Sequence, residues 1–95
     1  MEDRYMHNKL TKSFPNFENR DFYVELGEHI AFYRKRAHLS QKELARRLGI
    51  TRCYLNRIES FNIVQSFSLE LLFNISRELN VNPVYFFSPY PQNTK

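Results

Sequence analysis

Four side chains able to contact nucleic-acid bases share one face of a short helix expected over residues 51–60. Counted at about 100° per residue, that face carries Arg52, Cys53, Asn56 and Arg57. A guanidinium can donate two parallel hydrogen bonds to guanine O6 and N7, and an amide can serve an adenine or a phosphate. Cys53 is small enough to touch a thymine methyl group or a sugar. Because this face carries no carboxylate, the pattern favours contact with a nucleic acid.

The opposite face of the same helix is apolar and needs a partner to pack against. It carries Leu55 and Ile58. The stretch just before it has an inner face at helical spacing, formed by Leu44, Ala45 and Leu48. Gly49 lies between the two stretches, where a backbone that leaves a helix often needs a positive φ. Residues 41–59 therefore predict two short helices joined by a tight turn.

The basic residues are concentrated around these two helices. Residues 34–57 contain eight Lys and Arg and one acid, a net charge of +7, whereas the whole chain of 95 residues has a net charge of +4. The eight are Arg34, Lys35, Arg36, Lys42, Arg46, Arg47, Arg52 and Arg57. A basic band on a slightly acidic body is typical of a protein that binds a polyanion. The alternative is a solvated face of scattered charges, and the coincidence of the band with the helix pair disfavours it.

Residue types that support catalysis or metal binding are not clustered in the sequence. Cys53, the single cysteine, cannot form an internal disulfide, although its place beside arginines also permits a redox role. His7, His29 and His38 show no spacing typical of metal ligands. With no glycine-rich phosphate loop or paired carboxylates, we expect no enzyme, metal or cofactor. No apolar run approaches 18 residues, so we expect a cytoplasmic protein and no membrane contact.

Periodicity and capping residues predict further helices on either side of this pair. The first is expected from an Asp21 cap to about His38, where a positive φ would end it. Its apolar stripe is Phe22, Leu26, Ile30, Tyr33 and Ala37. Gly27, inside this helix, indicates close packing against a neighbour.

Two more helices are expected after the pair. One follows a Ser68 cap and ends at Asn80, with an inward face of Leu69, Leu72, Phe73, Ile75, Ser76 and Leu79. A short last helix opens at Asn82-Pro83 and runs through residues 84–87. Its four consecutive apolar residues cannot all face one core, which suggests self-association. The fold class expected is therefore all-α with five helices.

The order of these helices and their key residues resemble the λ-repressor/Cro-like (Xre) family of helix-turn-helix transcriptional regulators. The resemblance spans residues 26–87 and rests on matches in register throughout that span. The matching residues are Leu26, Ile30, Arg34, Ser40, Gln41, Leu44, Ala45, Leu48, Gly49, Ile50, Leu55, Ile58, Glu59 and Leu79. It implies a helix-turn-helix DNA-binding domain over residues 21–88. Residues 1–20 would be an irregular N-terminal extension, free or packed as an arm on DNA, on the body or on a second subunit, and residues 89–95 a loose tail.

The resemblance also implies roles for individual residues. Positions that contact bases in the family correspond to Arg52, Cys53, Asn56 and Arg57. Positions expected to contact the DNA backbone are Ser40, Gln41, Thr51, Tyr54 and Ser60. Glu59 lies on the inward side of its helix and needs a partner, because burying an unpaired carboxylate is costly. The family pairs the matching Glu with the matching Arg, which here gives an Arg34–Glu59 ion pair.

We therefore expect sequence-specific binding of double-stranded DNA and transcriptional regulation, with repression as its direction, by a homodimer on a near-palindromic operator. One departure keeps an alternative open. Residues 60–67 lack the Gly and the basic residues usual in the family and are apolar instead. The loop could bind a protein partner, so that the fold would serve as a protein-interaction module. Sequence-nonspecific nucleic-acid binding through the basic band is the other alternative.

Overall fold

The computed structural model describes residues 19–88 and shows an all-helical fold over that range. The elements are α2 (Arg20–Arg36), α3 (Gln41–Leu48), α4 (Arg52–Glu59), α5 (Leu69–Leu79) and η1 (Pro83–Phe87). The predicted fold class is confirmed, with one difference: the last of the five expected helices is a 3-10 helix, so the described chain has four α-helices. The expectations for an N-terminal arm and a C-terminal tail concern residues 1–18 and 89–95, outside the described residues.

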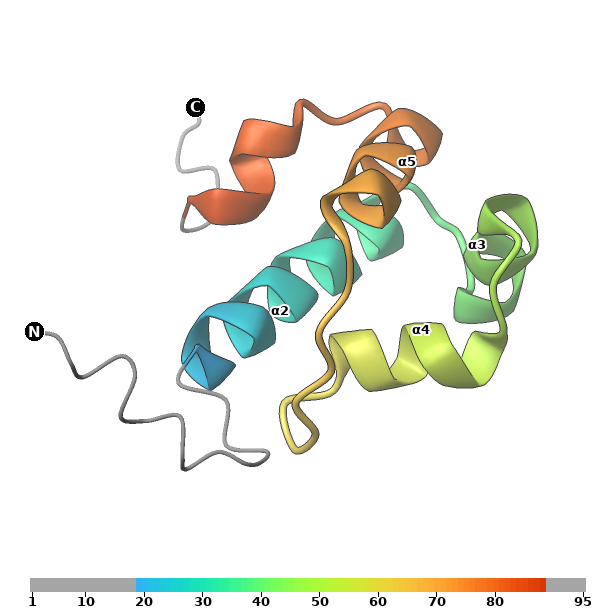
Figure 1. Ribbon diagram of the computed structural model, residues 1–95. Coiled ribbons are helices and arrows are strands. Elements are labelled where there is room, and N and C mark those ends of the chain that lie inside the picture. The colour runs from blue at the N-terminus through green and yellow to red at the C-terminus, as the bar shows by residue number, and fades with distance from the viewer. Residues whose placement is uncertain (1–18, 89–95) are drawn as a thin grey trace, which may run out of the picture.

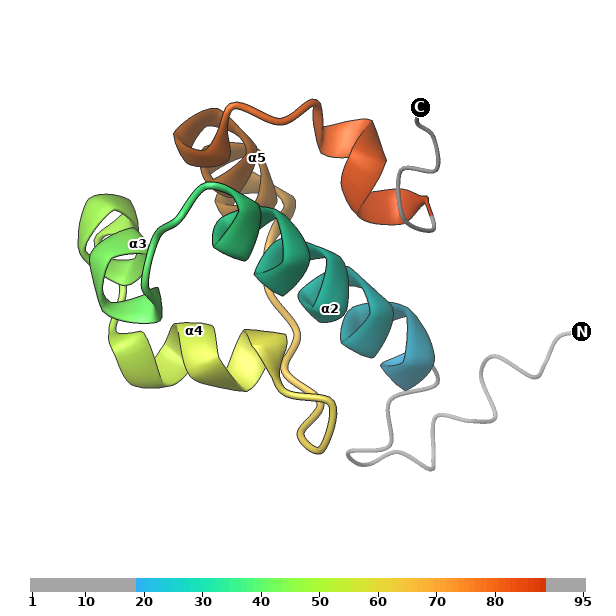
Figure 2. The same cartoon turned by 180° about the vertical axis from the view of Figure 1, so that it is seen from behind.

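Helix α2 is the axis around which the other elements are arranged (Figures 1 and 2). It packs against α4, η1 and α5, while α3 packs against α4 and α5. The side chains at the centre of this arrangement come from all five elements. Those with at most 2% exposure are Ile30, Leu44, Ala45, Leu55, Ile58, Leu72, Ile75 and Phe86. The apolar faces predicted for the two short helices thus meet in one core.

Most of the helix ends follow the predicted capping chemistry. The Ser40 hydroxyl accepts from the backbone N–H of Glu43, and the Thr51 hydroxyl accepts from that of Tyr54. Ser68 caps α5 in the same way. The residues expected to adopt a positive φ do so, namely His38, Gly49 and Asn80 at 60°, 75° and 58°. Local sequence therefore fixes where these helices begin and end.

The expected cap of the first helix was wrong. Helix α2 begins two residues earlier than predicted, with Asn19 at the cap position and no side-chain hydrogen bond there. Asp21 lies in the first turn instead, where its negative charge still opposes the positive end of the helix dipole.

Four residues expected to face inward are exposed. One is Ala37, which lies at the C-cap of α2 and not on its inner face. Phe22 is 67% exposed and borders the open hollow between α2, α5 and η1 instead of packing in the core. On α5, Leu69 and Phe73 are exposed and Leu71 is buried. Leu71 and Phe73 flank the stripe of Leu72 and Ile75 on opposite sides. That a residue is apolar does not by itself show which flank of this stripe a neighbouring helix covers.

Helices α2 and α4 approach each other closely at Gly27. A Cβ built on this glycine would lie 1.9 Å from the carbonyl oxygen of Ile58. No side chain larger than hydrogen fits against that backbone. The close packing expected at Gly27 is therefore present, and it sets the distance between the two helices.

A buried ion pair joins the same two helices. Arg34 Nε donates to Glu59 Oε2 and Arg34 Nη2 donates to Glu59 Oε1, each at 2.8 Å. The two side chains are only 9% and 4% exposed. The third nitrogen, Nη1, donates to the carbonyl oxygen of Leu39 at 2.8 Å. One arginine thus ties the end of α4 and the α2–α3 connection to α2.

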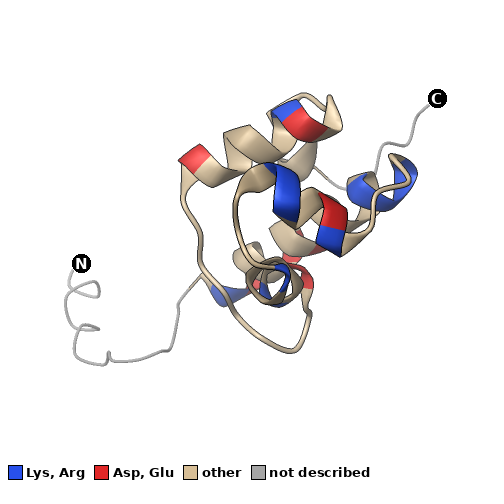
Figure 3. Cartoon of the chain, turned by 90° about the vertical axis from the view of Figure 1, so that its right-hand side faces the viewer, with Lys and Arg blue, Asp and Glu red and all other residues tan. Residues whose placement is uncertain are grey.

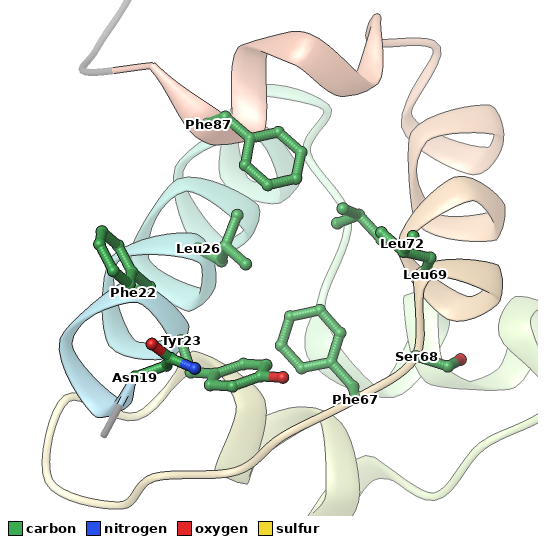
Figure 4. A pocket seen from close by; sticks show the side chains of 9 residues that line it. All are labelled: Asn19, Phe22, Tyr23, Leu26, Phe67, Ser68, Leu69, Leu72 and Phe87. Atoms are coloured by element: carbon green, nitrogen blue, oxygen red, sulfur yellow. The ribbon is translucent and has the colours of Figure 1, made fainter. Parts of the chain in front are cut away.

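A buried histidine anchors the last element. His29 Nδ1 donates to the carbonyl oxygen of Phe86 at 2.7 Å, and the Phe86 side chain is fully buried. Beside η1, an open apolar hollow of about 280 Å³ lies between the start of α2, the start of α5 and Phe87 (Figure 4). Residues of α3 and α4 do not line it.

We expect Gly27→Ala to lower the free energy of unfolding by about 1–3 kcal/mol. The added methyl group must push the backbone of Ile58 away, and overpacking of this kind outweighs the gain of about 1 kcal/mol in helix propensity. Thermal unfolding should show a midpoint lower by about 4–8 °C for each kcal/mol. The control is Glu28→Ala on the exposed face of the same helix. A midpoint for Gly27→Ala at or above the wild-type value would contradict the close approach.

We expect Glu59→Ala to destabilise the fold by about 3–5 kcal/mol, because it leaves the buried guanidinium of Arg34 without its carboxylate. Urea unfolding measures the effect. Glu43→Ala is the matched control, since the Glu43 carboxylate also binds two arginines but lies at the surface, where ion pairs contribute little. Equal losses for the two variants would show that the Arg34–Glu59 pair does not hold the fold.

Candidate nucleic-acid interface

The exposed face of α4 carries the four residues proposed from sequence to contact bases. Arg52, Cys53, Asn56 and Arg57 are all exposed, whereas Leu55 and Ile58 on the other face are buried. The eight-residue helix therefore has the orientation that its pattern predicts. Figure 3 looks onto the end of the molecule where α3 and α4 lie and shows Lys and Arg positions on both helices.

The two guanidinium groups of α4 remain available at the surface. Among the described residues, Arg52 makes no hydrogen bond or ion pair. Arg57 Nε donates to Gln65 Oε1 at 3.0 Å, an exposed contact with the loop that follows α4. This bond occupies one nitrogen of Arg57 and leaves both terminal nitrogens free to donate. Neither arginine is neutralised by a carboxylate within residues 19–88.

The acids near this face are already paired with other arginines. On α3, Glu43 accepts hydrogen bonds from Arg46 Nε at 3.1 Å and Arg47 Nε at 2.9 Å. The hydrogen bonds from Arg46 and then Arg47 lower the pKa of Glu43 to about 2. The carboxylate of Glu59 is taken up by Arg34. Part of the basic band counted in the sequence is therefore neutralised internally. Lys42, Arg52 and Arg57 keep their full positive charge, and Arg46 and Arg47 together keep a net charge of +1 beside Glu43.

A chain of hydrogen bonds connects the buried ion pair to the exposed face of α4. Gln41, the first residue of α3, donates from Nε2 to Glu59 Oε1 at 2.8 Å. The side-chain oxygen of Gln41, Oε1, accepts a hydrogen bond from Asn56 Nδ2 at 3.2 Å. The sequence suggested roles for Gln41, Asn56 and Glu59 separately, but no signal in it indicated that the three side chains are linked.

The remaining residues proposed to contact a DNA backbone lie at the helix ends. Ser40 and Thr51 are exposed and each accepts a capping hydrogen bond, so each hydroxyl proton is free to be donated. Tyr54 is half-buried beside the core. Ser60, at the other end of α4, is half-buried, and its hydroxyl accepts from the backbone N–H of Asn62 at 3.1 Å. Gln41 is bonded to Asn56 and Glu59 in the second half of α4. Thr51 and Ser60 cap the first and the last end of that helix.

The loop over residues 60–67 divides into an exposed part and a packed part. Phe61 is 71% exposed, and Ile63 is also exposed. Phe67 packs edge-on against Tyr23 of α2, with ring centroids 5.7 Å apart. The apolar side chains of Phe61 and Ile63 are therefore exposed to solvent in the loop that directly follows α4.

Among residues 19–88, no group of three or more His, Cys, Asp and Glu side chains is placed to hold a metal ion. None of the helices in that range is both long and apolar enough to cross a membrane.

Comparison with known proteins identifies the family. The model of the family described as Helix-turn-helix matches residues 30–86, more than half of the chain. Among solved structures, the "hypothetical transcription factor NHTF from Neisseria" superposes with a TM-score of 0.65 at 23% identity, covering 81% of this chain and 86% of that one. At this identity the likeness shows the fold alone. No curated protein matches the chain. The chain belongs to the helix-turn-helix family in its Xre and λ-repressor-like form, and this membership implies double-stranded DNA binding and supports a role in transcription regulation.

Proposed function

We propose that the protein is a sequence-specific transcriptional regulator that reads the major groove with α4. One observation carries the proposal: Arg52, Asn56 and Arg57 are exposed on a single face of α4, and neither arginine is paired with a carboxylate among residues 19–88. A helix of this width fits the major groove, where each base pair presents a distinct pattern of donors and acceptors. We propose repression as the direction of regulation, because occupancy of an operator is sufficient for it.

Each residue of the exposed face has a chemical role in this proposal. Arg52 and Arg57 donate to guanine O6 and N7. The hydrogen bond from Arg57 Nε to Gln65 supports this role, because it holds the guanidinium while its terminal nitrogens stay free. Cys53 contacts a thymine methyl group or a sugar, and Asn56 contacts a base. Contacts of this kind are worth about 1–3 kcal/mol of discrimination for a good bidentate pair.

The DNA backbone is bound by the residues around the helix ends. Ser40, Gln41 and Thr51 lie at the N-terminal ends of α3 and α4, where free backbone N–H groups and the helix dipole favour a phosphate. Tyr54 and Ser60 extend the same contact along α4. Phosphate contacts position the protein but carry no sequence information directly.

We further propose that the protein binds as a homodimer. The exposed apolar side chains away from α4 support this arrangement: Phe22, Leu69, Phe73, Val84, Tyr85 and Phe87. They lie on α2, α5 and η1, and Phe22, Leu69 and Phe87 border the apolar hollow in Figure 4. A two-fold dimer would present two α4 helices to half-sites about 34 Å apart. The exposed Phe61 and Ile63 support a second function, contact with a protein partner.

We expect Arg52→Ala and Arg57→Ala each to weaken binding to a selected operator duplex by about 10–100-fold, the loss of one bidentate base contact. Binding to a scrambled duplex should fall much less. Fluorescence anisotropy across a salt series measures both affinities. Arg77→Ala is the matched control, since Arg77 is an exposed arginine of α5, outside the proposed interface.

Each alternative function gives a different outcome in the same titrations. Equal affinities for both duplexes, with a steep dependence on salt, would mean that the basic band binds nucleic acid without reading sequence. Absence of binding at low salt would leave the protein-interaction module as the function.

We expect Phe87→Ser to shift the protein from dimer toward monomer in sedimentation equilibrium without lowering its melting temperature, because the side chain is 58% exposed in a single chain. Phe61→Ser is the control, since Phe61 is similarly exposed but lies in the loop after α4. A dimer unaffected by Phe87→Ser and dissociated by Phe61→Ser would place the interface at the loop instead.

A further inference from the structure

We propose that Gln41 is a positioning residue that fixes which way round the amide of Asn56 faces DNA, so that Asn56 selects a base with an exocyclic amine in the major groove, adenine or cytosine. This inference rests on the proposed function and deepens it, because it assigns a base class to one position of the operator. It follows from the direction of each hydrogen bond in the chain that begins at Arg34 and ends at Asn56.

This series of hydrogen bonds starts at the carboxylate of Glu59, which can accept hydrogen bonds but cannot donate them. The carboxylate of Glu59 receives two hydrogen bonds from Arg34, and the Glu59 side chain is 4% exposed. The ion pair holds both carboxylate oxygens in place at the seam between α2 and α4. Any further neighbour of these oxygens must therefore be a donor.

Gln41 is that neighbour, and its amide has two unlike ends. Its nitrogen faces Glu59 Oε1 at 2.8 Å, so its carbonyl oxygen faces the other way, toward Asn56. The reversed amide would bring a carbonyl oxygen against a carboxylate oxygen, two acceptors with no proton between them. The buried carboxylate thus sets the orientation of Gln41, and one N–H of Gln41 remains free for a phosphate.

The orientation of Gln41 then sets that of Asn56. Asn56 Nδ2 donates to Gln41 Oε1 at 3.2 Å, which uses one of its two N–H groups. Its carbonyl oxygen and its second N–H stay free on the exposed face of α4. An asparagine without this restraint could turn its nitrogen or its oxygen toward a base with equal ease.

The free groups of Asn56 match one class of base. Its oxygen can accept from N6 of adenine or N4 of cytosine, and its remaining N–H can also donate to N7 of adenine. Guanine O6 and thymine O4 could accept from the remaining N–H, but they offer no donor to the Asn56 oxygen, which would be left without a partner. A phosphate also offers only acceptors and would leave the same oxygen unpaired. Selection of an amine-bearing base is therefore the role that remains for Asn56.

The test compares base preferences rather than affinities alone. Wild-type protein and the variants Gln41→Met, Asn56→Ala and the double variant are each used to enrich duplexes from a randomised library, followed by sequencing. Methionine keeps the length of the glutamine side chain but cannot hold the Asn56 amide. Lys42→Met is the matched control, since Lys42 is the exposed neighbour on α3 and takes no part in the chain. Thermal unfolding of every variant confirms that it folds.

We expect wild type to prefer adenine or cytosine over guanine or thymine by about tenfold at the position where Asn56→Ala loses selectivity. In Gln41→Met this preference should fall to within about twofold, while the guanine positions that depend on Arg52 and Arg57 persist. The double variant should match Asn56→Ala, because Gln41 acts at this position through Asn56. Lys42→Met should weaken binding to all sequences and leave the preferences unchanged.

Two results would overturn the inference alone: a wild-type preference for guanine or thymine at this position, or a Gln41→Met profile identical to wild type there. A wild type that enriches no sequence over the starting library would overturn the proposed function, and this inference with it.

Discussion

The carboxylate of Glu59, held in the seam between α2 and α4, is the constraint on which the rest of the arrangement depends. Helix α4 has eight residues, too few for stability in isolation, so its orientation must come from its contacts. Leu55 and Ile58 bury one face, Gly27 sets how close α2 can come, and Arg34 fixes the end of the helix through Glu59. Rotation of α4 about its axis would break all three contacts at once.

A buried ion pair is a costly way to join two helices. Well-packed apolar side chains in the same place could be equally stabilising or more so. An apolar pair could not, however, set the orientation of a neighbouring polar side chain. The Glu59 oxygens accept from Gln41 as well as from Arg34, so the pair carries an orientation from the interior to the surface. The ion pair instead fixes the geometry of polar groups on α4. In the proposed function this fixed geometry serves specificity rather than stability.

Ion pairs of this kind also determine which charges near α4 remain free. Each carboxylate close to the exposed face is satisfied by arginines that do not belong to that face: Glu59 by Arg34, and Glu43 by Arg46 and Arg47. These pairs remove the acids that could otherwise fold back onto Arg52 and Arg57. The number of basic residues in the band therefore overstates its free positive charge, yet the cations left uncompensated include both arginines on the exposed face of α4. For a polyanion, the placement of charge matters here more than its sum.

Features that depend on neighbouring residues could be predicted from local chemistry. Among the features that join distant residues, the Arg34–Glu59 pair came from the family resemblance and the close approach at Gly27 from an interior glycine, and the others were missed. Caps at Ser40 and Thr51, the positive φ of Gly49 and the inward face of α4 follow from local chemistry, and the structure has them. The exposure of Phe22 and Phe73 could not be read from an apolar pattern, because it depends on which flank other helices cover. The link between Gln41 and Asn56 joins residues 15 positions apart, and only the packed fold brings them together.

The loop after α4 shows how a departure from the family pattern can serve the same face. Residues 60–67 contain no cation that could bind a phosphate. Within them, however, Gln65 accepts from Arg57 Nε, so the loop acts on the exposed face through a side chain of α4. Arg57 is then held by Gln65 of the loop and its neighbour Asn56 by Gln41 of α3, each by a glutamine side-chain oxygen. Each bond restrains a flexible side chain before any ligand arrives, and restraint of this kind lowers the entropy lost on binding. Preorganisation of Arg57 by Gln65 is therefore a way in which a loop without charge can serve a face that binds a polyanion.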